Sequence, residues 1–214
     1  MAIKKFSSRE AIQFSWNTVK ADLGFFIGFL LLGTIVQYVP VWLSEALKKN
    51  SSVLSVIVGI LGRVVQMIVS MGYIKMALKF HDGAKGEWSD LYTSYPLTWK
   101  YILSSICYGL IVFVGLLLLI VPGIIWAIRY QFFSYLLVDQ NLGPIEAIKK
   151  SGELTKGGAW DLFLFGLAAT GIMLLGALCL LVGLFVAMPV VLMAGTFVYR
   201  KLLSQSGLLT SASL

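Results

Sequence analysis

Two arginines lie deep inside long apolar stretches, and each has polar neighbours that could help it hold an anion. Arg63 is followed three residues later by Gln66, which a helix would place on the same face, and Arg129 is followed by Tyr130 and Gln131. No acidic residue lies in either stretch to neutralise the charge. An ionisable group at bilayer depth costs roughly 2.5 to 3.5 kcal/mol, so it usually faces a protein interior or a water-filled cavity. These five residues are therefore candidate contacts for an anionic ligand or lipid.

A purely structural interpretation of the same residues stays open. Arg129 lies close to the sequence VPG, where an arginine can cap the carbonyl groups of a broken helix. Arginine can also extend its side chain to a membrane interface, and glutamine can form hydrogen bonds between helices.

Other chemistry has little support. A hydrolytic or metal site needs converging ligands, whereas all ten carboxylates lie in loops, interfacial segments or the ends of apolar stretches. The single histidine, His81, begins the sequence HDGA, which favours a turn over a metal or proton-transfer site. Cys107 and Cys179 each lie within an apolar stretch and are expected to pack there as small side chains. The sequence predicts no catalytic residue, no metal site and no cofactor.

Composition indicates an integral membrane protein. The 214 residues are 58% hydrophobic and only 13% charged, and the mean hydropathy is +0.88. A soluble domain of this length would expose too much apolar surface, whereas about 20 apolar residues suffice for one helical crossing. A polar run separates Lys4 and Lys5 from the first apolar stretch, so we expect no removable signal peptide. The predicted fold class is all-α, a polytopic membrane helical bundle.

Apolar windows predict six transmembrane helices, at residues 22–43, 53–78, 101–121, 123–138, 160–186 and 189–203. The third and fourth are joined only by VPG at 121–123, and the last two by the segment around Met188 and Pro189, where proline favours a turn or kink. The six helices are therefore expected to form three hairpins.

Basic residues predict the orientation. Thirteen share one side of the predicted membrane, against two, Lys48 and Lys49, on the other. The thirteen are Lys4, Lys5, Arg9, Lys20, Lys75, Lys79, Lys85, Lys100, Lys149, Lys150, Lys156, Arg200 and Lys201. Because cytoplasmic loops carry the Lys and Arg excess, both termini are expected to be cytoplasmic. The net charge of +7 indicates anionic lipid heads as partners rather than nucleic acid.

An internal repeat accompanies the hairpins. EAIQFSWNTVK from Glu10 aligns with EAIKKSGELTK from Glu146, whereas DLYTSYPLTWK from Asp90 keeps only the acidic start and the final lysine. Each stretch is expected to be an interfacial amphipathic helix, and two of them carry apolar stripes. One stripe is Ile12, Trp16, Val19 and Leu23, and the other is Trp88, Leu91, Tyr92, Tyr95 and Trp99. The predicted organisation is one membrane domain at 1–203, with possible repeats at 9–81, 87–142 and 144–203, and a flexible tail at 204–214.

The segment 121–157 carries a resemblance to a known family. It contains a Pro-Gly turn, Arg-Tyr, Val-Asp and Gly-Pro-x-Glu-Ala-Ile-x-x-Ser-x-x-Leu-Thr-x-Gly in this order, and the chain later has FVYRKLL. This order resembles an uncharacterised family of bacterial multi-pass membrane proteins, which is similar to the membrane domain fused to some glycerophosphoryl diester phosphodiesterases. The resemblance implies six helices and a plasma (inner) membrane location, and it brings no catalytic residues.

Three functions remain open. We expect a non-enzymatic membrane protein that interacts with anionic lipids, or with an unknown protein partner, in envelope organisation. The alternative is a small transporter or lipid-handling protein that uses the intramembrane arginines, in which Arg63 or Arg129 should reach a cavity. The third, an enzyme acting on lipid, would require scattered polar side chains to meet in one pocket.

Overall fold

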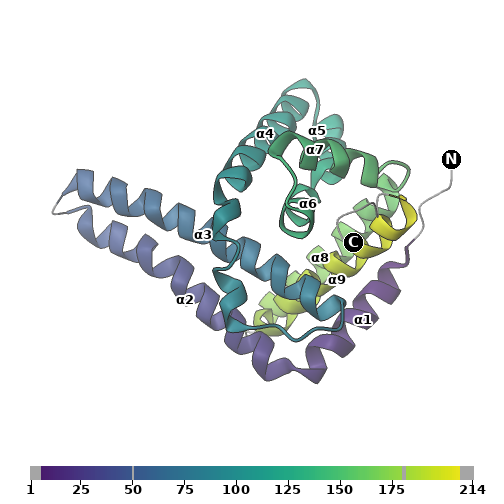
Figure 1. The fold of residues 1–214 in the computed structure, drawn as a ribbon, viewed down its shortest axis with the longest axis horizontal. Coiled ribbons are helices and arrows are strands. Elements are labelled where there is room, and N and C mark those ends of the chain that lie inside the picture. The colour runs from purple at the N-terminus through teal and green to yellow at the C-terminus, as the bar shows by residue number, and fades with distance from the viewer. Residues whose placement is uncertain (1–5, 50, 180–181, 208–214) are drawn as a thin grey trace.

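The protein is helical along the part of the chain that the structure describes, residues 6–49, 51–179 and 182–207 of a computed structural model (Figure 1). These residues form nine α-helices and two short 3₁₀ helices. They are α1 (Ser8–Ala21), α2 (Leu23–Leu47), α3 (Ser52–His81), η1 (Trp88–Leu91), η2 (Tyr95–Leu97), α4 (Thr98–Leu118), α5 (Ile120–Tyr130), α6 (Phe133–Gln140), α7 (Pro144–Leu154), α8 (Ala159–Leu178) and α9 (Leu184–Gln205).

Six segments within the described residues are long and apolar enough to cross a membrane. They are Leu23–Leu47, Ser52–His81, Trp88–Leu118, Ile120–Gln140, Ala159–Leu178 and Leu184–Gln205. Each covers most of a different predicted span, so the prediction of an all-α protein with six segments long and apolar enough to cross a membrane is confirmed. The helix α9 continues through Gln205, beyond the predicted start of the tail at 204, and residues 208–214 of that tail lie outside the described residues.

The two predicted proline turns lie elsewhere. The chain breaks at Leu119, which is extended, and Pro122 falls in the first turn of α5, where its missing N–H would have no helical partner. Pro189 lies inside α9, because α8 already ends at Leu178 and α9 begins at Leu184. A Cβ atom on Gly183 would lie 2.6 Å from the carbonyl oxygen of Gly176, so glycine lets the end of α8 and the start of α9 approach closely.

The stretch before α2 forms a helix that buries Val19 of the predicted stripe together with small side chains beside it. Ala11, Ser15 and Val19 of α1 are fully buried, and α1 packs along α9. Trp16, which belongs to the predicted stripe, is 48% exposed. The small side chains of Ala11 and Ser15 let α1 approach α9 closely, and this contact determines which face is buried.

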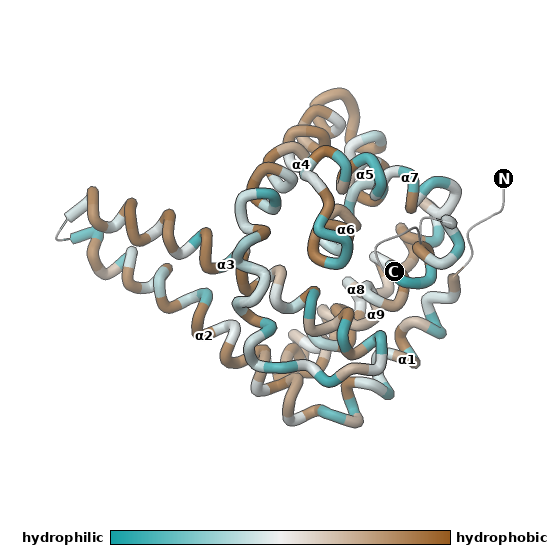
Figure 2. Tube along the Cα trace, in the orientation of Figure 1, coloured by the Kyte–Doolittle hydropathy of each residue, from teal (hydrophilic) through white to brown (hydrophobic). Residues whose placement is uncertain are grey.

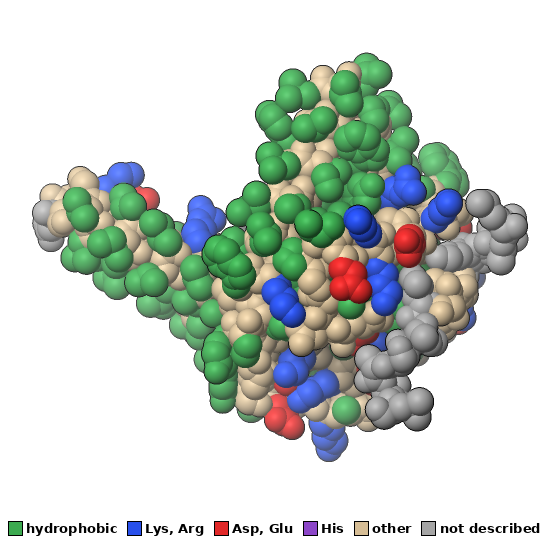
Figure 3. Space-filling model, turned by 45° about the horizontal axis from the view of Figure 1, so that its top comes forward, with side chains coloured by type: hydrophobic (Ala, Val, Ile, Leu, Met, Phe, Trp, Pro, Cys, Tyr) green, Lys and Arg blue, Asp and Glu red, His purple; other side chains and the backbone are tan. Residues whose placement is uncertain are grey.

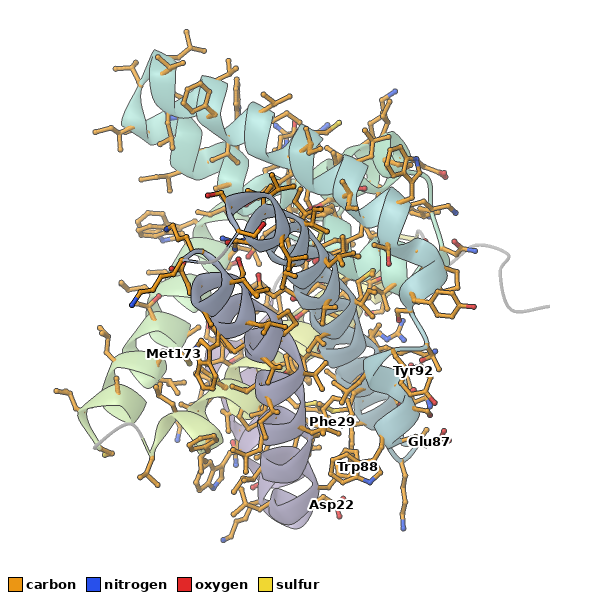
Figure 4. All side chains as sticks on the ribbon, turned by 90° about the vertical axis from the view of Figure 1, so that its left-hand side faces the viewer. Asp22, Phe29, Glu87, Trp88, Tyr92 and Met173 are labelled. Carbon is orange, nitrogen blue, oxygen red and sulfur yellow. The ribbon has the colours of Figure 1, made fainter. Side chains whose placement is uncertain are left out.

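The stretch before α4 forms two 3₁₀ turns instead of one amphipathic helix. The Asp90 carboxylate accepts a hydrogen bond from the Glu87 backbone N–H at 2.8 Å and pairs with Lys79 Nζ at 2.8 Å, which fixes the first turn. Proline at position 96 then removes a donor that a continuous helix would use. Trp88 points towards Phe29 of α2 (Figure 4), with ring centroids 6.1 Å apart.

The helices form a polar body with apolar projections. In Figure 1, α2 and α3 extend together as a long arm, while α4 and α5 project in another direction. Hydropathy along the chain follows this division (Figure 2), and charged side chains gather on the body and at the tip of the arm (Figure 3). The main core cluster lies in the body, where α6, α7 and α9 contribute Leu136, Leu154 and Tyr199.

Arg200 ties three helix ends together within the body. Its Nη1 donates to Asp139 Oδ2 on α6 at 2.8 Å, and its Nη2 donates to Asp82, the residue that caps the C-terminus of α3. The Tyr199 hydroxyl donates to the same Asp139 oxygen at 2.7 Å. We call Arg200, Asp82, Asp139 and Tyr199 the Arg200 network. Asp82 and Gly83 also form the turn predicted after His81.

The two carboxylates of this network should differ in their contribution to stability. Asp139 is 15% exposed and accepts two hydrogen bonds, whereas Asp82 is 47% exposed. We expect Asp139→Asn to lower the free energy of unfolding by about 3 kcal/mol, and Asp82→Asn by about 1 kcal/mol or less. Unfolding by sodium dodecyl sulfate in mixed micelles measures both, and equal losses would contradict the assignment.

Candidate functional site

A pocket of about 670 Å³ lies between α4, α5 and α7. We call it the α4–α5–α7 pocket. Its apolar lining is Cys107, Leu110, Ile111, Ile145 and Ile148, with Gly152 beside them. Its polar lining is Arg129, Tyr130, Lys149, Glu153 and Lys156. The lining thus contains three cationic side chains and one carboxylate beside an apolar surface.

The helix α7 is held against this site by two hydroxyl groups. The carbonyl oxygen of Arg129, at the end of α5, accepts hydrogen bonds from Ser151 Oγ at 3.2 Å and from Thr155 Oγ1 at 2.8 Å. Ser151 Oγ also accepts from the backbone N–H of Phe132 at 3.1 Å. These bonds satisfy backbone groups on both sides of the break between α5 and α6. They also explain why Ser and Thr occupy these positions of the Gly-Pro-x-Glu-Ala-Ile segment.

A glycine on α7 leaves room for the ring of Tyr130, next to Arg129. A Cβ atom on Gly152 would lie 2.9 Å from Tyr130 Cε1 and 3.8 Å from Arg129 Nε. Among the described residues, Arg129 Nε is buried and makes no hydrogen bond. A buried N–H donor without a partner is unfavourable, and it shows that the guanidinium of Arg129, which lines the pocket, is not fully hydrogen-bonded within the described residues.

The five predicted contacts fall into three places. Arg129 and Tyr130 lie together in the α4–α5–α7 pocket. Arg63 and Gln66 lie on α3, where Arg63 Nη1 donates to Gln66 Oε1 at 3.3 Å. Gln131 donates to the carbonyl oxygen of Ile128 at 3.0 Å and lines a separate apolar pocket between α6, α8 and α9. The structure therefore does not place the five residues in one cluster.

Lys149 and Lys156 were not among the predicted contacts. Lys149 lies on α7, and Lys156 lies two residues beyond Leu154, where α7 ends. The two lysines are seven residues apart, close to two helical turns, and both line the α4–α5–α7 pocket. In the sequence they belong to the basic residues that predict membrane orientation, and only the packing of α7 against α5 places them beside Arg129. Their seven-residue spacing was the available signal.

Comparisons with known proteins place the chain among uncharacterised relatives. The sequence model of a family described as "Protein of unknown function (DUF975)" matches residues 47–206. Uncharacterized proteins of Mycobacterium bovis and Mycobacterium tuberculosis are 28% identical over 149 residues, which are 64% of this chain and 46% of theirs. The chain thus spans less than half the length of these curated relatives. No solved structure matches the chain.

Removal of the Ser151 hydroxyl tests how α7 is held. Ser151→Ala leaves the buried Phe132 N–H without its acceptor, so we expect a loss of about 1 to 3 kcal/mol in the free energy of unfolding. Ser204→Ala is the matched control, because Ser204 is exposed and bonds only within its own helix end. Detergent unfolding measures both variants, and a Ser151→Ala variant as stable as Ser204→Ala would contradict this role.

Proposed function

The chain belongs to the family of unknown function DUF975, and from its own pocket we propose that it is a non-enzymatic membrane protein that binds anionic lipid headgroups. The observation that carries this proposal is the buried, unpartnered Nε of Arg129 in a pocket that Lys149 and Lys156 also line. Envelope organisation through bound lipid is the role that we infer.

The lining of the pocket matches the chemistry of a phospholipid. A phosphate group can accept hydrogen bonds from a guanidinium and from ammonium groups, which favours an anionic headgroup at the cationic side. The apolar side chains of α4 and α7 offer contact to the beginning of the acyl chains. Leu110 and Ile145, at 58% and 61% exposure, continue the apolar lining outward.

The membrane orientation forms part of the proposal. Lys79 lies near the end of α3, and Lys100 lies near the start of α4. Lys150 lies on α7, and Arg200 lies near the end of α9. These positions belong to the polar body, whereas Lys48 lies at the opposite end of the arm. Because the Lys and Arg excess marks the cytoplasmic side, we infer that the body faces the cytoplasm of an inner membrane and that both termini lie there.

A threefold architecture is also proposed, and the packing supports it. The hairpins would be α2 with α3, α4 with α5 and α6, and α8 with α9, whose helices pack together. The aligned copies at α1 and α7 bury matching positions, since Ala11 and Ser15 correspond to Ala147 and Ser151, and all four are fully buried.

The non-enzymatic assignment rests on how the carboxylates are used. Asp82 and Asp139 are paired with Arg200, and Asp90 is paired with Lys79. The α4–α5–α7 pocket contains one carboxylate, Glu153, and no histidine. The resemblance to a phosphodiesterase membrane domain contributes nothing to the proposal, since the mycobacterial relatives carry no such description.

One observation favours the alternative, a lipid-handling or transport function. The pocket is reached by Arg129, as that alternative requires, and it adjoins the break between α5 and α6. Lipid movement would require the pocket to open towards both leaflets. A lipid-scrambling assay in proteoliposomes separates the two functions: bilayer crossing that Arg129→Gln abolishes would favour lipid handling, whereas binding without crossing supports the proposal.

The binding test uses phosphatidylglycerol as the probe. We expect Arg129→Gln to weaken binding of phosphatidylglycerol to the purified protein by at least tenfold, because a charge-assisted hydrogen bond contributes about 1.5 to 3 kcal/mol. Native mass spectrometry with phosphatidylcholine as the competing neutral lipid measures the difference.

The matched control is Arg9→Gln, which removes the same charge from an exposed position outside the pocket. It should leave the affinity within about twofold. If both variants bind phosphatidylglycerol as the wild type does, the pocket is not the lipid site. Equal losses in both variants would mean that net charge, rather than the pocket, attracts the lipid.

A further inference from the structure

The outer half of the arm formed by α2 and α3 stands apart from the main core cluster and from a second cluster that includes Phe26, Phe29 and Met76. Among the described residues, neither cluster includes a residue of α2 beyond Phe29 or of α3 before Val65. The outer half of each helix is therefore covered only by the other helix of the arm, as Figure 1 shows. Its remaining surface has nothing from the rest of the chain packed upon it.

The arm is nevertheless firmly closed. Ser44 Oγ donates to the carbonyl oxygen of Ser55 at 2.9 Å, and Ser55 Oγ donates to the carbonyl oxygen of Ser44 at 2.8 Å. A Cβ atom on Gly62 would lie 3.0 Å from Pro40 Cβ, so a glycine lets the two helices approach. The outer surface of the arm is thus a preformed face rather than a loose segment.

Arg63 lies on that face, near the middle of the apolar part of α3. It is exposed, and Ile60, three residues before it and on the same side of α3, is 60% exposed. With a rise of 1.5 Å per residue, Arg63 lies about 16 Å along α3 from Ser52 and about 18 Å from Lys75. Both distances are about half of a hydrocarbon core of roughly 30 Å.

The chain itself offers this arginine no counter-charge. Within the described residues its guanidinium bonds to the neutral amide of Gln66, and no ion pair includes it. The carboxylates of the membrane-spanning helices lie near helix ends, as Glu45, Asp139 and Asp161 do. A second copy of the chain could therefore not present a carboxylate at the depth of Arg63.

We propose that the α2–α3 arm is a docking surface for a transmembrane helix of another protein that carries a carboxylate near its middle, with Arg63 as its counter-ion and Gln66 as a second donor. Charged groups inside membranes pair with one another, and a guanidinium can bond a carboxylate through two parallel hydrogen bonds. The exposed apolar side chains around Arg63 would pack against the same helix. This surface is separate from the α4–α5–α7 pocket, so it does not depend on the proposed lipid function.

The test uses a synthetic, leucine-rich transmembrane peptide with one aspartate at its midpoint. Energy transfer from a dye on the C-terminus of the full chain to the labelled peptide is measured in phosphatidylcholine vesicles. We expect the aspartate peptide to bind the wild-type protein at least tenfold more tightly than an all-leucine peptide. Arg63→Leu should abolish that difference, whereas Lys48→Leu, at the exposed tip of the arm, should preserve it.

Three results of the binding experiment would overturn the proposal. Equal binding of the aspartate peptide to wild type and Arg63→Leu would remove Arg63 from the interface. Loss of peptide binding when phosphatidylglycerol replaces part of the phosphatidylcholine would identify a lipid phosphate as the occupant of Arg63. Energy transfer between two labelled copies that Arg63→Leu abolishes would identify a second copy instead.

The folding of the variant is checked in the same preparation. Arg63→Leu should unfold at the wild-type temperature or above, because it removes an unpaired charge from an apolar surface. A lower unfolding temperature in both Arg63→Leu and Arg63→Gln would show that Arg63 supports the fold of this chain, and this too would overturn the proposal.

Discussion

The fold depends on the pairing of one guanidinium with two carboxylates where three helices end. Arg200 on α9 bonds Asp139 on α6 and Asp82 at the end of α3, and these residues are 61 and 118 positions from it in the sequence. Helices that project in different directions share few side-chain contacts away from the body, so their common ends must be joined there. Because the Asp139 carboxylate is only 15% exposed, leaving it or the Arg200 guanidinium without a partner would be costly, so the network favours the arrangement in which α6 and α9 meet. The exposed Asp82 adds a weaker link to the end of α3.

Three elements, α1, η1 and α7, pack against the helices that meet at this junction. The helix α1 packs on α9, η1 packs on α3, and α7 packs on α4, α5 and α6. In the proposed threefold architecture, each element that precedes a hairpin therefore covers the hairpin before it, and the first covers the last. No unit then completes its own packing, which makes the body depend on all three hairpins at once. The buried hydroxyl groups of the two aligned copies have different partners. Ser15 Oγ donates to the carbonyl oxygen of Ala11 in its own helix, whereas Ser151 Oγ donates to the carbonyl oxygen of Arg129 on α5.

The sequence predicts the membrane-spanning helices well because an apolar run of about 20 residues has few alternatives to a helical crossing. It predicts their junctions less well. Proline suggested a turn at Pro189, yet a helix tolerates proline when tertiary contacts place the turn elsewhere, here at Gly176 and Gly183. The stripe at 88–99 has helical periodicity, but the ion pair of Asp90 with Lys79 overrides it. The dipeptides Val138-Asp139 and Tyr199-Arg200 were visible in the sequence, but the hydrogen bond between Arg200 and Asp139 was not. Hydrophobic periodicity carries no information about a contact between residues 61 positions apart.

Arg63 and Arg129 show why residue type and local context alone could not separate two kinds of site. Both are arginines in apolar stretches without acidic neighbours, and both have polar side chains within three residues. What distinguishes them is the element packed beside each one. The helix α7 bonds the carbonyl oxygen of Arg129 and brings two lysines to its side chain, which makes a concave cationic pocket suited to a phosphate. Beside Arg63 the described part of the chain contributes only the amide of Gln66 and the apolar surface of the arm. A single cation on a convex apolar surface suits one carboxylate on a flat helix better than a headgroup that needs several donors. The same residue type is thus expected to serve a lipid at one place and a protein helix at the other.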